Sequence, residues 1–153
     1  MKIKFNKIHF FISIISLLFL FSFSISKNEP FVVVQEAYLN KPLKGSHSTA
    51  AYMNLKNKSD DRIVIKGLSC INLLAEFHKT EISDLGLLRM KKLDFIILEP
   101  NTEKRFEPTK EHIMLMGKGV ATISDGVKCN LIIQNENLDP LSREVPFIFE
   151  LKG

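Results

Sequence analysis

Cysteine is scarce in this sequence of 153 residues, which contains only Cys70 and Cys129. The two lie in no C-x-x-C motif, which excludes a thioredoxin-like redox centre and a zinc knuckle. In an exported protein they could form a disulfide. Two separately buried thiols are equally compatible with the sequence, because strand alternation places Cys129 on an apolar face with Leu131 and Ile133. The sequence alone leaves both alternatives open.

Signatures of common hydrolytic enzymes are also absent. The sequence has no G-x-S-x-G, no H-E-x-x-H and no cysteine nucleophile placed with a base. We therefore expect a protein that is not an enzyme.

Residues 1–26 have the composition of an export signal. Lys2, Lys4 and Lys7 precede an apolar stretch from Phe10 to Phe23, and small residues follow as far as Ser26. We expect cleavage after Ser26. A retained membrane anchor is the alternative, but serines interrupt the run, which is shorter than the roughly 20 apolar residues of a spanning helix.

Charge is nearly balanced in the remainder of the chain. All 17 acidic residues and 18 of the 21 basic ones lie after residue 26. A domain without clustered lysine and arginine has no electrostatic footprint for nucleic acid, so we expect no nucleic-acid partner. Residues 27–153 are long enough for one hydrophobic core and too short for two, which predicts a single domain.

The apolar stretches after residue 26 are short, rich in branched side chains and separated by turn-forming sequences. This pattern predicts an all-β sandwich. Because of Gly86, the segment Ser83 to Leu88 is interpreted as a loop leading to Met90. The expected strands are residues 31–39, 49–56, 62–70, 73–80, 92–98, a short segment near Arg105, 112–117, 127–134 and 145–151.

Two histidines and two methionines, His78, Met90, His112 and Met114, form a candidate set of imidazole and thioether ligands. Thioether sulfur is a poor ligand for magnesium, calcium or manganese, whereas Cu(I) accepts both ligand types. Strand alternation places His112 and Met114 on one face and turns His78 away from the core. The H-x-M step is therefore predicted to act as a bidentate clamp.

Taken singly, each of these residues has a structural explanation. A methionine in a β domain usually packs, and a histidine in a strand is usually structural. We assign Met53 and Met116 to packing or to the surround of the site, and His47 to the surface. On residue type and periodicity alone, metal binding is a hypothesis that rests mainly on the H-x-M pair.

The spacing of the four residues adds weight to that hypothesis. Eleven residues separate His78 from Met90, 21 separate Met90 from His112, and one separates His112 from Met114. This spacing resembles the H-x(n)-M-x(21)-H-x-M signature of the periplasmic PCu(A)C copper chaperones. Residues 49–57 (TAAYMNLKN) and 111–117 (EHIMLMG) resemble two strand motifs of that family. The resemblance extends from about Val32 to Phe149.

The sequence departs from the family pattern at three places. Lys79 follows the first histidine where the family usually has an acidic residue, and Lys110-Glu111 replaces glycines before the second. Neither change affects a ligand position. The sequence also ends at Gly153 without the tail rich in methionine and histidine that some members carry and that is linked to a second copper. We therefore expect a single Cu(I) site.

The resemblance implies a cupredoxin-like Greek-key β-sandwich, in agreement with the strand pattern. It implies that His78, Met90, His112 and Met114 bind one Cu(I) in the periplasm, with neutral imidazoles. It also implies delivery of copper to the copper-centre subunit of cytochrome c oxidase, with a Sco-type thiol protein as a further candidate partner. Membrane contact is expected only through the signal segment or the recipient.

This ligand set suits a carrier in an oxidising compartment, where thiol pairs form disulfides but thioethers do not. Four neutral ligands leave the charge of the ion uncompensated, which predicts a site near the surface at one end of the sandwich. Because imidazole must be deprotonated to bind, affinity should fall in acid.

Two other functions compete with this interpretation. A blue-copper electron-transfer protein would need a thiolate close in sequence to a histidine, and no histidine follows Cys129. A metal-free sandwich could instead act as an assembly or adhesion module, with its histidines and methionines serving structure.

Overall fold

Ten strands and a short 3-10 helix make up residues 31–135 and 143–153, the part of the chain described by the computed structural model. The predicted signal segment, residues 1–26, lies outside the described residues. Within them, no helix is long and apolar enough to cross a membrane. The elements are β1 (Val32–Asn40), β2 (Ser48–Asn57), β3 (Ile63–Cys70), β4 (Leu74–Ile82), β5 (Leu88–Leu93), β6 (Ile96–Leu98), β7 (Glu103–Phe106), β8 (Glu111–Met116), η1 (Lys118–Thr122), β9 (Val127–Asn135) and β10 (Arg143–Lys152).

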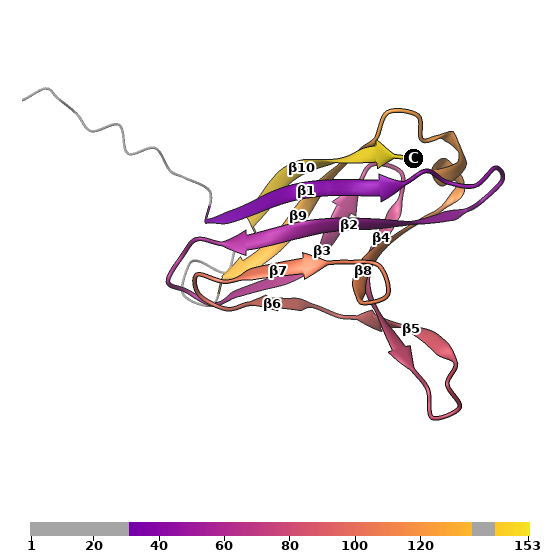
Figure 1. Cartoon of the computed structure of the whole chain (residues 1–153). Coiled ribbons are helices and arrows are strands. Elements are labelled where there is room, and N and C mark those ends of the chain that lie inside the picture. Colours follow the sequence, from indigo (N-terminus) through magenta and orange to yellow (C-terminus); the bar gives the residue numbers. More distant parts are fainter. Residues whose placement is uncertain (1–30, 136–142) are drawn as a thin grey trace, which may run out of the picture.

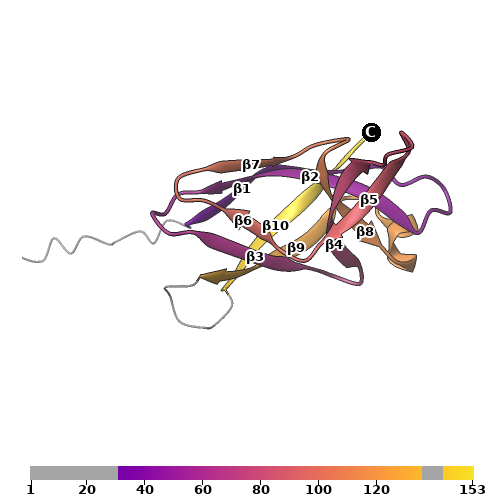
Figure 2. The same cartoon turned by 90° about the horizontal axis from the view of Figure 1, so that it is seen from below.

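The strands form one continuous sheet that folds over on itself (Figure 1). Its order is β5-β4-β8-β2-β1-β10-β9-β3-β6, and β7 also pairs with β2. The neighbours β1 and β10 run parallel, whereas the other pairs are antiparallel. Seen from below, the two halves of the sheet enclose the interior (Figure 2). The predicted all-β, single-domain sandwich is confirmed, and the sandwich is nearly closed.

The core lies between the two halves of the sheet and is filled by alternate side chains of the strands. Both halves contribute branched aliphatic residues, and the Phe77 and Phe106 rings stack with centroids 5.5 Å apart. The described strands and this core all lie within residues 31–153. Fully buried members include Leu39, Met53, Leu55, Ile63, Ile65, Leu98, Ile113, Leu115, Leu131, Ile133 and Phe149.

A disulfide joins Cys70 and Cys129, which are register partners on β3 and β9. The alternative of two separately buried thiols is therefore wrong, because direct cross-strand neighbours bring the two sulfur atoms together. The pairing links residues 59 positions apart in the chain. No cysteine of the protein remains free.

The strand predicted at residues 92–98 is in fact two strands on opposite edges of the sheet. β5 pairs with β4, whereas β6 pairs with β3, and the chain crosses between them at Asp94 and Phe95. Leu93 and Ile96, the inward residues at the break, are three positions apart, and a single strand with a period of two cannot bury both. The loop predicted up to Leu88 is also too long, because Leu88 and Met90 already belong to β5.

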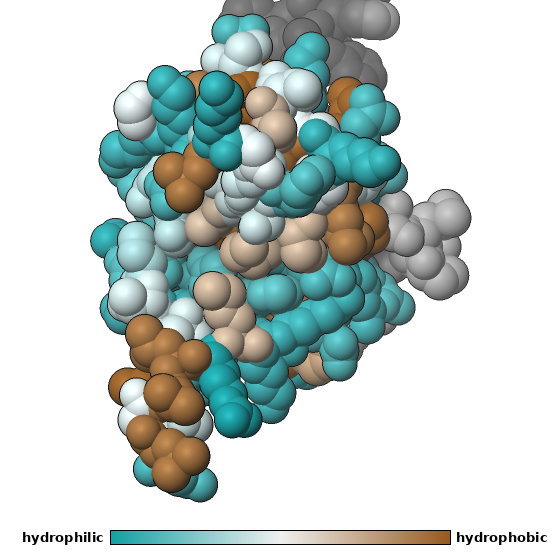
Figure 3. All heavy atoms as spheres, turned by 90° about the vertical axis from the view of Figure 1, so that its right-hand side faces the viewer, coloured by the Kyte–Doolittle hydropathy of each residue, from teal (hydrophilic) through white to brown (hydrophobic). Residues whose placement is uncertain are grey.

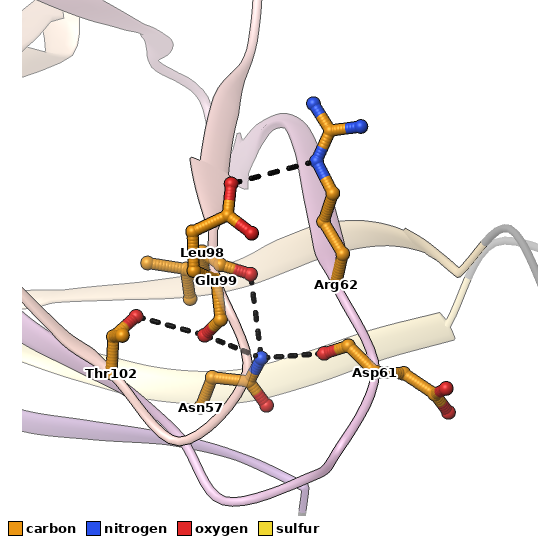
Figure 4. Close-up of polar contacts among 6 residues, drawn as sticks. All are labelled: Asn57, Asp61, Arg62, Leu98, Glu99 and Thr102. Carbon is orange, nitrogen blue, oxygen red and sulfur yellow. Dashed lines mark hydrogen bonds and ion pairs between the residues drawn. The ribbon is translucent and has the colours of Figure 1, made fainter.

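Asn57 ties three chain segments together at the end of β2 (Figure 4). Its side-chain amide donates to the carbonyl oxygens of Asp61 at 2.8 Å, Glu99 at 3.0 Å and Leu98 at 3.3 Å. Its Oδ1 accepts from the backbone N–H of Ser59 at 2.9 Å. Asn57 itself is fully buried, so its amide depends on these protein partners in place of water. This residue is the final position of the TAAYMNLKN motif.

We expect Asn57→Ala to lower the free energy of unfolding by about 2–4 kcal/mol, because it removes a buried amide that bonds three carbonyl groups and the Ser59 N–H. Asn54→Ala, on the same strand, removes only a bond to the exposed Glu36 and should cost less than about 1 kcal/mol. Urea denaturation of both variants measures the difference. Equal losses would show that the buried network is unimportant.

Candidate metal site

Three neighbouring strands, β5, β4 and β8, carry all four candidate ligands on the outer face of the sheet. Phe77 on β4 and Ile113 on β8 are register partners, and both are buried in the core. Side chains alternate along a strand, so the next residues, His78 and His112, point away from the core. They are themselves direct partners in the same ladder. The outward orientation predicted for His78 is confirmed.

The two histidine rings lie close together but are buried to different extents. Their centroids are 6.0 Å apart, with an angle of 71° between the ring planes. His112 is only 5% exposed, and its Nδ1 lies 3.0 Å from the carbonyl oxygen of Lys110. A carbonyl can only accept, so Nδ1 of a neutral His112 carries the proton and Nε2 keeps a lone pair.

Met114 lies two positions after His112 on the same face, as predicted. Its register partners are Glu76 on β4 and Ala50 on β2, and its side chain is half-buried between them. Met116 continues this row and remains a weaker candidate. Met53 is buried in the core and His47 is exposed, in agreement with the roles expected for them.

Met90 lies at the exposed margin of this cluster. It pairs with Thr80, whereas its neighbour Lys92 pairs with His78. Met90 is therefore a diagonal neighbour of His78 on the same face, a separation that a long side chain can span. It is 64% exposed. The structure thus brings His78, His112 and Met114 together and places Met90 beside them at the surface.

Glu76 is a member of the site that sequence reasoning missed. Its Oε2 lies 3.1 Å from Nε2 of His78, and its Oε1 forms an ion pair with Lys92. The hydrogen bonds from Lys92 and then from His78 lower the pKa of the Glu76 carboxyl group. The sequence feature that indicates this role is the i, i+2 spacing, which places Glu76 and His78 on one strand face. A carboxylate therefore lies beside the neutral candidate ligands.

His78 has a nitrogen available for a cation. With Nε2–H donated to Glu76, the lone pair of a neutral His78 lies on Nδ1, which is buried and has no hydrogen-bond partner among the described residues. Buried polar atoms are nearly always paired, so such an atom calls for an explanation. Metal-binding histidines characteristically give one nitrogen to a carboxylate and the other to the metal. The residues present therefore fit a metal ion.

The donor set of this face is soft. Within the described ranges, no group of three or more His, Cys, Asp or Glu side chains is placed to hold a metal ion. A cation bound here would therefore use thioether sulfur together with the two imidazoles, a combination that suits Cu(I). A blue-copper centre is excluded, because both cysteines are joined in the disulfide and neither can supply a thiolate.

Lys79, the departure from the expected acidic residue, faces the other way. It lies on the inner side of the β4–β5 hairpin, where its register partners are Lys91 and Glu111, and it forms an ion pair with Glu81 at 3.8 Å. The substitution therefore leaves the face that carries the candidate ligands unchanged.

The fold is that of PCuAC domains. The copper-bound PCuAC domain from PmoF2 superposes with a TM-score of 0.59 at 19% identity, over 80% of this chain and 92% of that one. The apo PmoF2 PCuAC domain gives 0.60 at 18% identity, over 80% and 90%, and the apo PCuAC domain from PmoF1 gives 0.59 at 17%, over 80% and 93%. The sandwich expected from the resemblance is confirmed.

The sequence also matches a family model. Residues 32–147 match the family described as "Putative lipoprotein LpqE-like", so the chain belongs to the LpqE-like family. A lipoprotein family is one of exported proteins, in agreement with the predicted export signal. Both cysteines of this sequence are engaged in the disulfide. No curated protein matches the sequence.

We expect the two histidines to adopt opposite tautomers in the metal-free protein: Nε2–H for His78, held by Glu76, and Nδ1–H for His112, held by the Lys110 carbonyl. Long-range ¹⁵N–¹H correlation spectra recorded with neutral imidazoles distinguish them. Glu76→Ala should release the preference of His78 only, and Glu81→Ala, on the opposite face of β4, should change neither. An Nδ1–H tautomer for His78 in the unmodified protein would contradict this geometry.

Proposed function

We propose that this protein is an exported, non-enzymatic Cu(I) carrier that binds one ion with His78, Met90, His112 and Met114. The observation that carries the proposal is the cross-strand histidine pair, in which Nδ1 of His78 is buried, has no hydrogen-bond partner among the described residues and lies on the same face as Met114. The likeness of the fold to a copper-bound PCuAC domain supports it.

Strands β8 and β4 each supply part of the ligand set. β8 supplies the half-buried Met114 and the nearly buried His112, whose imidazole is oriented by the backbone carbonyl of Lys110. β4 supplies His78, whose imidazole is a stronger donor when its other nitrogen is bonded to the Glu76 carboxylate. Glu76 is a positioning residue, and its negative charge lowers the cost of holding a cation at this face.

Met90 suits the role of the ligand that controls exchange. It lies on the edge strand β5 and is the most exposed of the four. A methionine ligand has no proton to regain when it dissociates, and it can be replaced by a ligand from another protein without a change in charge. We propose that the recipient in the periplasm is the copper-centre subunit of cytochrome c oxidase, with a Sco-type protein as a further partner.

Titration with Cu(I) against a competing chelator tests the site. We expect one equivalent to bind, and His112→Ala or Met114→Ala to weaken binding by about 100-fold or more, because each removes a direct ligand. Affinity should fall as acid protonates the imidazoles. His47→Ala and Met53→Leu, which lie outside the site, serve as controls and should bind normally.

Two results would overturn the proposal. Undiminished binding in both the His112 and Met114 variants would refute the ligand assignment. No bound copper after loading would favour the metal-free assembly or adhesion module. Delivery is tested separately, by mixing the loaded protein with the isolated copper-centre domain of the oxidase and measuring which protein retains the metal.

A further inference from the structure

The hairpin formed by β4 and β5 projects from the sandwich (Figure 1) and carries a group of exposed apolar side chains. Ile82 is 73% exposed, Leu85 82%, Leu87 57% and Leu88 67%. We call these four residues the hairpin tip. Figure 3 shows a compact brown group at the lower end of the molecule, the end at which the hairpin of β4 and β5 projects in Figure 1.

Hydrogen bonds within the turn fix the conformation of the hairpin tip. The N–H of Ser83 donates to the Leu87 carbonyl at 2.8 Å, and the N–H of Gly86 donates to the Ser83 carbonyl at 2.8 Å. The N–H of Leu87 also donates to the Ser83 hydroxyl at 3.1 Å. Gly86 has a φ of +74°, which favours glycine. These three hydrogen bonds fix the shape of the turn from which the leucines project.

Grouping distinguishes the tip from ordinary surface leucines. Single exposed apolar residues are normal, whereas contiguous ones mark interaction sites. Leu43, for example, is 81% exposed but is the only large exposed apolar residue of the loop between β1 and β2. The tip needs a partner, and the charges behind it indicate which kind.

Basic residues form a row behind the tip. Lys79 and Lys91 are register partners, three ladder positions from the pair Ile82 and Leu88, which corresponds to roughly 10 Å along the strands. Between them lie the register partners Glu81 and Arg89, and Glu81 forms an ion pair with Lys79 at 3.8 Å. Residues 79–92 contain four basic side chains against two acidic ones, Glu81 and Asp84. The hairpin therefore changes along its axis from apolar to cationic.

We infer that the hairpin tip inserts into the interface of an anionic membrane, with Lys79 and Lys91 at the level of the lipid phosphates. Interfacial segments bury apolar side chains about 5–10 Å deep and are attracted by anionic headgroups, which matches the distance between the tip and the cationic row. A second copy of the chain fits less well, because β5 is an edge strand whose lysines oppose pairing with another strand. The inference does not depend on copper binding.

The absence of tryptophan provides a direct test. Leu85→Trp places a single fluorophore at the tip, and Leu43→Trp places one at an equally exposed position elsewhere. Residues 27–153, which contain every described strand and the disulfide, are mixed with vesicles of 30% phosphatidylglycerol in phosphatidylcholine. We expect a blue shift of the Leu85→Trp emission, and its quenching by brominated lipid, but neither effect for Leu43→Trp. Vesicles of phosphatidylcholine alone should produce a much smaller shift.

Variants that remove either the apolar or the basic side chains separate the two contributions to vesicle binding. Leu85→Ser with Leu87→Ser should lower vesicle binding by about tenfold or more at any lipid charge. Lys79→Gln with Lys91→Gln should lower it by roughly tenfold on anionic vesicles only. Leu43→Ser is the matched control and should bind normally. Thermal unfolding of each variant confirms that the sandwich is intact.

Three outcomes would overturn the inference: no shift of the Leu85→Trp emission with anionic vesicles, an equal shift for Leu43→Trp, or a shift that depends on protein concentration without vesicles. The last would identify the tip as a self-association surface. Capture of a copper-accepting protein by the tip, without vesicle binding, would identify a protein partner instead. Each result leaves the copper titration unaffected, so the two proposals fail independently.

Discussion

The pairing of Phe77 with Ile113 inside the core is the constraint on which the candidate site depends. Because side chains alternate along a strand, burying these two residues turns His78 and His112 outward and opposite each other. Sliding β4 by one residue would expose Phe77 and bury His78, at the cost of several kcal/mol of apolar burial and an unsatisfied imidazole. Core packing therefore also sets the geometry of the ligands.

Features that depend on local alternation could be predicted from the sequence. His112 and Met114 are two residues apart in a strand, and so they share a face whatever that strand pairs with. The register of β4 against β8 could not be predicted, because it depends on side chains that meet across the core. For the same reason the pairing of Cys70 with Cys129, which lie 59 positions apart, remained undecided until the ladder of β3 and β9 was known.

Glu76 and Asn57 show two different limits of sequence reasoning. Alternation along β4 puts Glu76 on the face of His78, but the role of Glu76 also depends on Lys92, a residue of the next strand. Asn57 was noted as part of a motif, and its role depends on carbonyl groups from two distant segments. A polar side chain is informative in a sequence when its partners are local. These two have partners that only the fold brings near.

Lys79 lies on the face of the hairpin opposite the candidate ligands. As the residue after His78 it departs from the expected acidic residue, and an acid there would have faced Lys91 across the ladder and neutralised it. A lysine instead places Lys79 opposite Lys91 behind the apolar tip, and like charges directly opposite in a sheet repel, although Glu81 forms an ion pair with Lys79. An external anion lying against the two lysines would offset the repulsion that remains. The alternation that leaves the ligand face unchanged thus frees the opposite face of the same strand for a second role.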